Sequence, residues 1–400
     1  MKRNLKRFFN PKSIALIGAS KDPNKVGGIL LKKLLKFRGK VIPINPKYYH
    51  LGELRTYPSV LEYPSKIDLA IIAIPAEFVN ESLIECAKKG IKNIIIISAG
   101  FSEIKENNLE KLMIQTIKKY NLNVLGPNCF GIYNPNLQLD TTFSNITPKK
   151  GDIAFISQSG ALWSYIADLK IGFSGYVSLG NMADLSFTEW LEYFINDRHT
   201  KKIIMYIEKI KDGKKFIELC KNSKKEIIVL KAGQTKQGQQ AALSHTASLA
   251  TEYEIYKGAF AQAKIKVVDS LSKAVGTHSE EIKLKKKQKV IIITNAGGAG
   301  AILSDKITKS GQNLIMPPID ILGTANENDY ENALKSIKNK SAKIIVILTP
   351  QSMSNPLATA KVLINSKHKK NIIALFLGDK SIKQAKNLLE KNKIPVYTNI

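Results

Sequence analysis

A single histidine, His245, stands in a run of small and hydroxylated residues, GQQAALSHTASLA at 238–250. The run lies between an apolar strand pattern at 226–233 and a helical pattern at 252–262, which predicts a loop. A histidine on such a loop can project and react, whereas one packed among large apolar side chains cannot. The alternative is a surface histidine without a role, and the groups that face His245 decide between the two.

One carboxylate placed to face it is Glu208, the last residue of the apolar run KIIMYIE. Sites in α/β proteins form at the carboxyl ends of strands. If Glu208 accepts a hydrogen bond from one ring nitrogen of His245, it fixes the tautomer and leaves the other nitrogen as a nucleophile. The alternative is an ion pair of Glu208 with Lys209 or Lys211, and the spacing leaves both open.

Two segments of small residues each join a strand pattern to a helical pattern: SQSGA at 157–161 and NAGGAG at 295–300. Backbone N–H groups at a helix start, aided by the helix dipole, form an anion site. Plain helix capping is the alternative, but it needs only one serine. We predict that a phosphoryl group is held between the two helix starts by Ser157, Gln158, Ser159, Gly160, Gly297 and Gly298.

The elements that must position these residues follow a strand–helix–strand order. Over the first 130 residues, short apolar runs such as SIALIG and IDLAIIAIP alternate with amphipathic stretches such as VGGILLKKLLKF. This order predicts βαβ units and a doubly wound parallel sheet, whose ligands bind beyond the carboxyl ends of the strands.

The strand ends of this first sheet predict a nucleotide site. The second strand ends in Asn45-Pro46-Lys47, where NAD-binding domains carry an acidic residue for the ribose hydroxyls. A lysine there suits a phosphorylated ribose, as in coenzyme A or NADP, although Lys47 in a solvated turn is the alternative. The glycines after the first strand do not form G-x-G-x-x-G. The predicted binding residues are Gly18, Ser20, Lys47, Ile74, Pro75, Ser98, Gly100 and Asn128.

Two further α/β units follow the first. One opens with DIAFISQSGALWSYIADL and the other with KVIIITNAGGAG, and a charged run at 283–289 lies between them. We therefore expect three tandem α/β domains, at 1–140, 150–283 and 288–400.

The chain has 61 Lys and Arg against 33 Asp and Glu, a formal charge of +28. The lysines are spread along the chain, and the densest run has no interleaved aromatic residues, as a single-strand binder would have. We attribute the charge to compositional bias and attraction for phosphorylated ligands, with an acidic partner subunit as a further option.

Composition also bounds the location of the chain. No apolar run approaches the ~20 residues of a membrane span, and no apolar signal segment follows the basic start. Cys86, Cys129 and Cys220 lack metal-like spacing and suit a reducing compartment. We expect a cytoplasmic protein with no nucleic acid, membrane or disulfide framework.

Several motifs together resemble the α subunit of NDP-forming acyl-CoA synthetases, above all the ADP-forming acetyl-CoA synthetases, in the succinyl-CoA synthetase superfamily. GAS-x6-GG, NPK, IPA, SAGF and GPNCFG are similar to the CoA-binding domain. IAFISQSGA, VSLGNMADL, EYFINDRHT and YIE are similar to the second domain, and LKAGQTKQGQQAALSHTASLA is similar to its phosphohistidine loop. ITNAGGAGAILSD and ILTPQSMSNP are similar to the third domain.

The resemblance implies a Rossmann-like CoA-binding domain followed by two flavodoxin-like domains. It implies that His245 carries a phosphoryl group, that Glu208 orients it, and that acyl-CoA, ADP and phosphate give acid, ATP and CoA. ADP or ATP and Mg²⁺ would bind a separate ATP-grasp β subunit, with an α2β2 assembly expected and no metal site in this chain.

Three alternatives accompany this interpretation: a non-catalytic CoA-binding subunit of the same superfamily, a succinate–CoA ligase α-type subunit, and a basic nucleic-acid binder. The presence of both His245 and Glu208 argues against the first, and the third α/β unit argues against the second. Departures from the family's usual SHTGSLAG and KAGRT are Ala247, Thr251 and Gln234. We expect Ala247 to stiffen the loop and the missing arginine at 234 to weaken phosphate or partner contacts.

Overall fold

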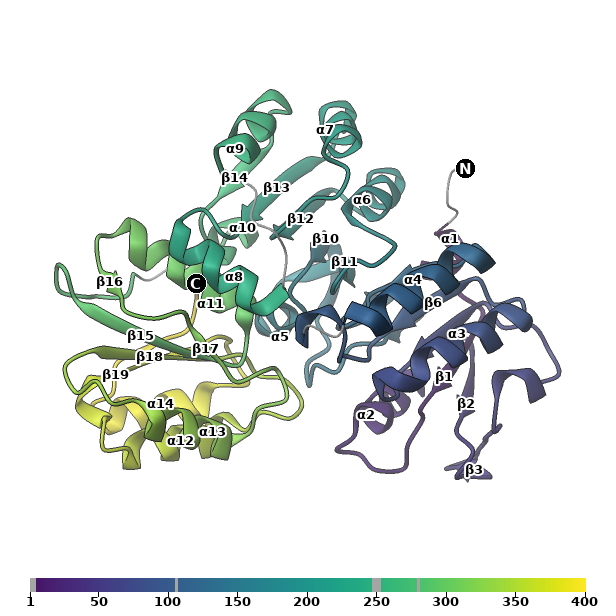
Figure 1. Cartoon of the computed structure of the whole chain (residues 1–400), viewed down its shortest axis with the longest axis horizontal. Helices are drawn as coiled ribbons and strands as arrows, with labels where there is room; N and C mark the ends of the chain where they lie inside the picture. Colours follow the sequence, from purple (N-terminus) through teal and green to yellow (C-terminus); the bar gives the residue numbers. More distant parts are fainter. Residues whose placement is uncertain (1–4, 105–106, 247–252, 279–280) are drawn as a thin grey trace.

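Three main sheets follow one another along the chain (Figure 1). The computed structural model describes residues 5–104, 107–246, 253–278 and 281–400. The inner strands at 69–72, 93–96 and 372–376 are short apolar runs that are buried throughout, as expected for parallel sheets covered on both faces. The predicted α/β fold class is confirmed.

The first sheet is parallel, in the order β2-β1-β5-β6-β7. Its strands are β1 (Ser13–Ile17), β2 (Lys40–Ile44), β5 (Leu69–Ile72), β6 (Asn93–Ile96) and β7 (Asn123–Leu125), with a hairpin of β3 (His50–Leu51) and β4 (Leu54–Arg55) beside β2. One face is covered by α3 (Val79–Lys88) and α4 (Asn107–Tyr120), and the other by α2 (Val26–Leu34). The sheet order reverses at β1, where doubly wound sheets form their ligand crevice.

The second sheet has the order β14-β13-β12-β10-β11-β8-β9. Its strands are β8 (Ile132–Asn134), β9 (Leu139–Asp140), β10 (Lys149–Ser157), β11 (Gly172–Ser178), β12 (Lys202–Ile207), β13 (Glu226–Lys231) and β14 (Lys266–Val268). Its helices are α5 (Ala161–Asp168), α6 (Phe187–Asn196), α7 (Gly213–Asn222), α8 (Lys236–Thr246), α9 (Tyr253–Gln262) and α10 (Leu271–Val275). The antiparallel edge pair β8 and β9 lies within residues 1–140, so the chain enters the second sheet before the expected end of the first domain.

The third sheet is parallel, in the order β16-β15-β18-β19-β20, with β17 beside β15. Its strands are β15 (Lys289–Thr294), β16 (Asn313–Leu314), β17 (Ile319–Asp320), β18 (Lys343–Leu348), β19 (Ile372–Phe376) and β20 (Val396–Tyr397). Its helices are α11 (Gly297–Lys309), α12 (Glu327–Ser336), α13 (Pro356–Asn365) and α14 (Lys383–Lys391).

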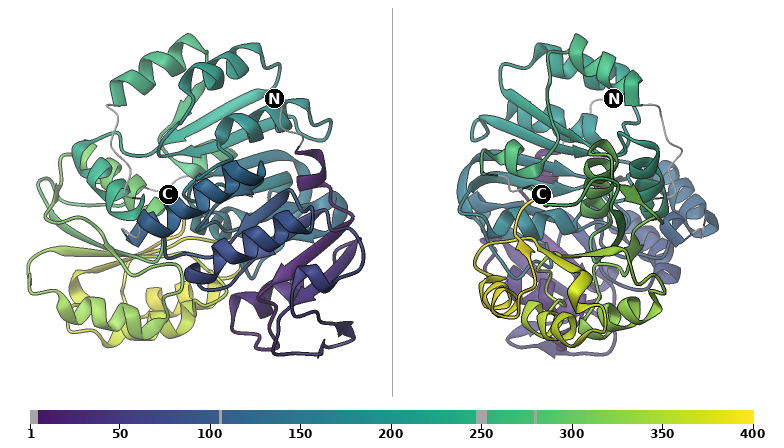
Figure 2. Two further views of the ribbon diagram at one scale, coloured as in Figure 1. Left: turned by 45° about the vertical axis from the view of Figure 1, so that its right-hand side comes forward. Right: turned by 90° about the vertical axis from the view of Figure 1, so that its left-hand side faces the viewer.

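The second sheet contributes to two cores at once, because successive side chains of a strand point to opposite faces. On β12, Ile203 and Met205 belong to an apolar cluster shared with the first domain. Ile204 and Tyr206 belong to a cluster shared with the third domain. The first and third domains accordingly lie on either side of the second (Figures 1 and 2). The short helix α1 (Lys6–Phe9) also packs on the second domain, with Phe8 against Trp190.

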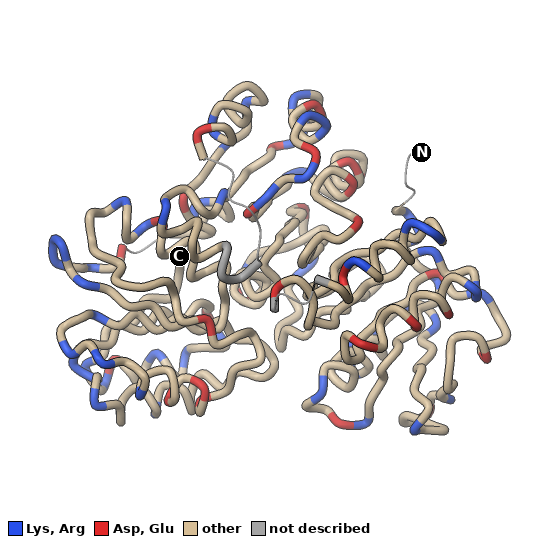
Figure 3. Tube along the Cα trace, in the orientation of Figure 1, with Lys and Arg blue, Asp and Glu red and all other residues tan. Residues whose placement is uncertain are grey.

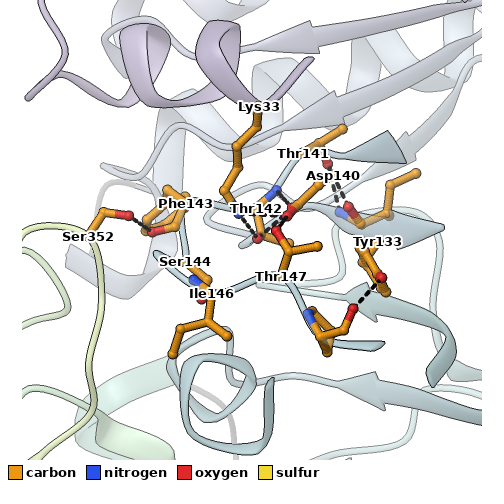
Figure 4. Close-up of polar contacts among 12 residues, drawn as sticks. Lys33, Tyr133, Asp140, Thr141, Thr142, Phe143, Ser144, Ile146, Thr147 and Ser352 are labelled. Carbon is orange, nitrogen blue, oxygen red and sulfur yellow. Dashed lines mark hydrogen bonds and ion pairs between the residues drawn. The ribbon is translucent and has the colours of Figure 1, made fainter. Parts of the chain in front are cut away.

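The segment around Asp140–Phe143 contacts elements of all three domains (Figure 4). The Lys33 ammonium on α2 donates to Asp140 Oδ2 at 2.6 Å and to Thr142 Oγ1 at 3.2 Å. The backbone N–H and hydroxyl of Ser352, from the third domain, both donate to the Phe143 carbonyl. This segment therefore ties the domains together.

Other expectations from composition can be compared with the structure. Lys and Arg are distributed over all three domains (Figure 3). The three cysteines are buried and form no disulfide. Among the described helices, none is both long and apolar enough to cross a bilayer.

One local expectation was wrong. The segment that begins at Gly238 is not a loop up to His245, because α8 extends through Thr246. Its glutamines and alanines favour helix, and Thr235 caps the start, where its hydroxyl accepts a hydrogen bond from Gly238 N at 3.0 Å. Residues 247–252, with the departures Ala247 and Thr251, lie outside the described residues.

Candidate functional site

The strand ends of the first sheet form one continuous row. Gly18 N donates to Ile44 O at 3.0 Å, and the Asn45 amide donates to Ala19 O at 2.8 Å. These contacts join the segments that carry Gly18, Ser20 and Lys47. Ser20 Oγ accepts a hydrogen bond from Asp22 N at 3.1 Å, while the Lys47 side chain is exposed.

The row continues through the ends of β5, β6 and β7. Ser98 Oγ lies 2.5 Å from Ile74 O, to which it donates, and Ser98 O accepts a hydrogen bond from Asn128 N at 2.8 Å. Pro75 follows Ile74 directly at the start of the 3-10 turn η2 (Ala76–Phe78). Gly100 follows Ser98 with a φ of +107°. All eight predicted nucleotide-binding residues thus lie on this row.

The turn after β1 requires glycine at 18. Gly18 has a φ of +91°, and a Cβ there would lie 2.3 Å from Ala73 O. Any side chain would separate β1 from β5 at the crevice. This close approach fits a backbone-lined nucleotide site. Lys47 lies three residues beyond the end of β2, and its contact with a phosphorylated ribose stays a prediction.

The two predicted anion-binding helix starts meet each other. A Cβ on Gly298, at the start of α11, would lie 2.5 Å from Ser159 Oγ, just before α5. Gly297 is the first residue of α11, and Gly160 is the N-cap of α5. Ser159 and Gly298 are both buried. The starts of α5 and α11 therefore face each other, as predicted.

Two residues of the predicted anion loop are engaged within the protein. Ser157 Oγ donates to Ser159 O at 2.6 Å. Gln158 Oε1 accepts from the N–H groups of Glu208 and Lys209 at 2.7 and 2.8 Å. The loop SQSGA thus holds the end of β12 as well as the start of α5.

Glu208 is buried beside these helix starts. The Tyr206 hydroxyl donates to Glu208 Oε1 at 3.1 Å and lies 3.3 Å from Gly298 O. Burial, and then the Glu208 charge, raise the pKa of Tyr206 well above its usual value, so the phenol remains a donor. No ion pair of Glu208 with Lys209 or Lys211 occurs among the described contacts. The Lys211 ammonium instead donates to Met182 O.

The backbone of His245 lies in the last turn of α8, and its side chain lies outside the described residues. α8 packs along α11 and also against the 3-10 turn η3 (Ser102–Ile104), which follows the SAGF segment. Gly238, near the start of α8, faces Asp305, near the end of α11. The two helices run in opposite senses (Figure 1), so the end of α8 that carries His245 points toward the start of α11.

Two family models match the chain. The model described as "CoA binding domain" matches residues 12–135, and the model described as "Succinyl-CoA ligase like flavodoxin domain" matches residues 150–278. The α subunit of acetate–CoA ligase [ADP-forming] II from Pyrococcus furiosus is 39% identical over 98% of this chain and 93% of its own length. The chain belongs to the ADP-forming acetate–CoA ligase family.

Another relative in this ligase family is longer. The acetate–CoA ligase [ADP-forming] of Methanocaldococcus jannaschii is 41% identical over 98% of this chain, which spans 61% of that protein's length. A solved structure of acetyl-coenzyme A synthetase 1 from Candidatus Korarchaeum cryptofilum, in complex with phosphate and ADP, aligns with a TM-score of 0.65 at 34% identity. It covers 99% of this chain and 94% of its own.

Residues that the sequence analysis did not single out also connect the elements of the candidate site. The Asn181 amide donates to Glu103 Oε2 at 2.6 Å and to Ser102 Oγ at 3.2 Å, and its oxygen lies 3.3 Å from the Asn128 amide nitrogen. Asn181 thereby joins the second domain to the CoA-binding domain beside α8. Its position just after β11 was the available signal.

Asp305 was likewise missed. Its Oδ2 accepts hydrogen bonds from Gly233 N and Gln234 N, and its Oδ1 accepts from the N–H and hydroxyl of Thr235, all at 2.7–3.0 Å. The third domain therefore fixes the root of α8. Gln234, where the family commonly has arginine, lies at this root and not at the His245 end.

Proposed function

We propose that the chain is the α subunit of an ADP-forming acyl-CoA ligase that uses His245 as a phosphoryl carrier. The overall reaction is acyl-CoA + ADP + phosphate ⇌ carboxylic acid + ATP + CoA. The observation that carries the proposal is the course of α8. This helix, with His245 in its last turn, packs between η3 of the CoA-binding domain and α11, whose start meets Ser159 and the Tyr206–Glu208 pair.

Acyl-CoA is proposed to bind along the row of strand ends from β2 to β7. The loop after β1 and the exposed Lys47 would hold its phosphates, with Ile74, Pro75, Ser98, Gly100 and Asn128 along its length. Phosphate attacks the thioester carbonyl, the C–S bond breaks, and acyl phosphate and the CoA thiol form. The helix starts at Ser159–Gly160 and Gly297–Gly298 stabilise the anionic phosphate through backbone N–H groups.

His245 then attacks the phosphorus of the acyl phosphate, and the carboxylic acid leaves as its anion. A neutral imidazole is needed for this step, with the reacting nitrogen unprotonated. Glu208 is proposed to accept a hydrogen bond from the protonated ring nitrogen of His245 and to stabilise the charge on the phosphorylated ring. Tyr206 positions Glu208 by donating a hydrogen bond to its carboxylate, and Gln158 does so by accepting one from the Glu208 backbone N–H.

The phosphoryl group is proposed to pass from His245 to ADP on a partner subunit. The α-subunit designation of the Pyrococcus relative supports a separate partner. We propose an ATP-grasp β subunit that binds ADP and Mg²⁺, in an α2β2 assembly. Within the described residues, no group of three or more His, Cys, Asp or Glu side chains is arranged to hold a metal ion.

The test is reconstitution of the full chain with an ATP-grasp β subunit. Free CoA release from a panel of acyl-CoAs is measured with ADP and phosphate. We expect repeated release that requires all three substrates and both subunits, and that slows in Glu208→Gln while CoA binding persists. Release of more than one CoA per site without ADP, any release without phosphate, or unchanged turnover in Glu208→Gln would contradict the proposal.

A further inference from the structure

Two aromatic side chains, Phe130 and Phe143, lie in contact beside the proposed phosphoryl site. Phe130 belongs to the segment between β7 and β8, and Phe143 follows β9. Their ring centroids are 3.9 Å apart, and the ring planes are inclined by 43°. Phe130 is 3% exposed, whereas Phe143 is half-buried. The reaction proposed above uses neither ring.

Phe130 packs directly on the start of α5. A Cβ on Gly160, the N-cap of α5, would lie 2.5 Å from the Phe130 Cβ and 3.0 Å from two atoms of its ring. The Phe130 N–H donates to Ser178 Oγ, at the end of β11, at 2.8 Å. Phe130 is thereby held at the carboxyl edge of the second sheet, where α/β proteins form their sites.

Phe143 is tied to the segment that precedes α11. Its carbonyl accepts hydrogen bonds from the N–H and hydroxyl of Ser352 (Figure 4). The adjoining Gln351 forms a β-bridge with Ser144, and its amide donates to Asn295 O at 3.2 Å, just before the start of α11. The aromatic pair therefore connects to both of the helix starts that are proposed to hold phosphate.

The pair also adjoins the row of strand ends proposed to bind CoA. Asn128 precedes Phe130 by two residues, and its N–H donates to Ser98 O at 2.8 Å. The backbone from Asn128 to Phe130 thus runs from that row to the start of α5. In the proposed reaction the acyl carbon lies at this same junction, because it is bonded to the CoA sulfur and is attacked by phosphate. The rest of the acyl group extends from that carbon and needs apolar surface.

We propose that Phe130 and Phe143 form the wall that limits the length of the acyl group. The inference rests on the proposed function, because it concerns the acyl end of that same site. Two rings in contact leave no room between them for a chain, so the wall favours a short acyl group over a longer one. Phe143 is the less buried ring and is the one that meets the substrate, with Phe130 packed behind it.

The test compares acetyl-CoA with butyryl-CoA in the reconstituted enzyme. The full chain is combined with an ATP-grasp β subunit, and kcat/KM for CoA release is measured for both substrates with ADP and phosphate. A methylene more or less in an apolar pocket changes kcat/KM by roughly 10- to 200-fold. We expect the wild type to favour acetyl-CoA, and Phe143→Ala to raise the butyryl-to-acetyl ratio by about tenfold or more. Phe130→Leu should raise it less.

The ratio is the informative quantity, because both substrates meet the same fraction of folded enzyme. Tyr193→Ala is the matched control. Tyr193 is a half-buried aromatic residue of α6 whose ring centroid lies 5.1 Å from that of Phe9. This change should lower stability and leave the ratio unaltered, and thermal melting compares its cost with that of Phe143→Ala.

Three outcomes would overturn this inference while the wild type remains active. They are an unchanged ratio in both Phe143→Ala and Phe130→Leu, a wild-type preference for butyryl-CoA, and an equal shift of the ratio in Tyr193→Ala. A wild type that releases CoA from neither substrate, in the presence of the β subunit, ADP and phosphate, would instead contradict the proposed function, and this inference with it.

Discussion

The buried carboxylates compared at the second domain's two junctions have different partners. Toward the third domain, two buried carboxylates face backbone N–H groups. Asp305 accepts from residues 233–235, and Asp168 of α5 accepts from the N–H groups of Asp379 and Ser381 at 2.8 and 3.0 Å. Toward the first domain, Asp140 instead pairs with a lysine, Lys33 (Figure 4).

The contrast shows what selects the partner of a buried acid in a lysine-rich chain. With 61 basic residues against 33 acidic ones, ion pairs would be the simple expectation. Backbone N–H groups fix the conformation of the loop they belong to, whereas a lysine side chain leaves its carboxylate partner freer. The junction that supports α8 therefore uses the more rigid arrangement. The predictions below test whether changes at this junction destabilise the chain more than changes at the junction with the first domain.

Asp305→Ala should have the largest effect. It leaves four donors at the root of α8 without their acceptor, and we expect a loss of about 3 kcal/mol in the free energy of unfolding. Urea denaturation measures it. Gly238→Ala should also destabilise, although alanine favours helix, because its Cβ would lie 2.0 Å from Asp305 Oδ1. If Asp305→Ala left the free energy of unfolding unchanged, the carboxylate would not stabilise the root of α8.

Asp168→Ala should cost less, about 2 kcal/mol, because Asp168 accepts from two N–H groups and one hydroxyl, that of Ser381. Ser381→Ala removes only the hydroxyl contact and serves as the milder matched change. Urea denaturation of both variants ranks them. If Asp168→Ala cost more than Asp305→Ala, the proposed order within this junction would be wrong.

Lys231 gives a pH-dependent effect in the same junction. Its folded pKa of about 8 lies below the ordinary 10.5, so between these values the unfolded chain holds a proton that the folded chain lacks. Stability from this group therefore rises with pH, by about 1 kcal/mol from pH 8 to 9. We expect Lys231→Met to be as stable as the wild type or more so at pH 7, with the difference shrinking toward pH 9. A constant difference would contradict the low pKa.

The ion pair toward the first domain should give the smallest effect. Lys33→Met leaves Asp140 with the N–H and hydroxyl of Thr142, at 2.9 and 2.7 Å, so the carboxylate keeps donors. We expect a loss of about 1 kcal/mol that diminishes in high salt. Denaturation at low and high salt measures it. A salt-independent loss as large as that of Asp305→Ala would remove the distinction between the junctions.

Much of the fold could be predicted because the strands are short apolar runs with clear ends. SIALIG and KIIMYIE correspond to β1 and β12, and the strand-end residues Gly18 and Glu208 follow from them. The helix starts at Ser159 and Gly298 were likewise visible as small residues between a strand and a helix. We predicted that these two helix starts lie close together because their sequence patterns are similar.

Side-chain partners across domains could not be predicted. Asp305 and Asp168 lie within helical patterns and have no local motif, since their partners are 70 or more residues away in sequence. Gln158 looked like a phosphate ligand because its loop does, yet its side-chain oxygen holds the end of β12. The helix around His245 was missed because serine and threonine suggested a loop, while α11 packs against that segment and stabilises it.

The most direct test of the account is phosphorylation of the full chain by radioactive ATP with the ATP-grasp subunit. We predict acid-labile label on His245, absent in His245→Ala and retained in His199→Ala, which changes a half-buried histidine that precedes β12. Label that persists in His245→Ala, or that maps to another residue, would contradict the assignment of His245 as the phosphoryl carrier.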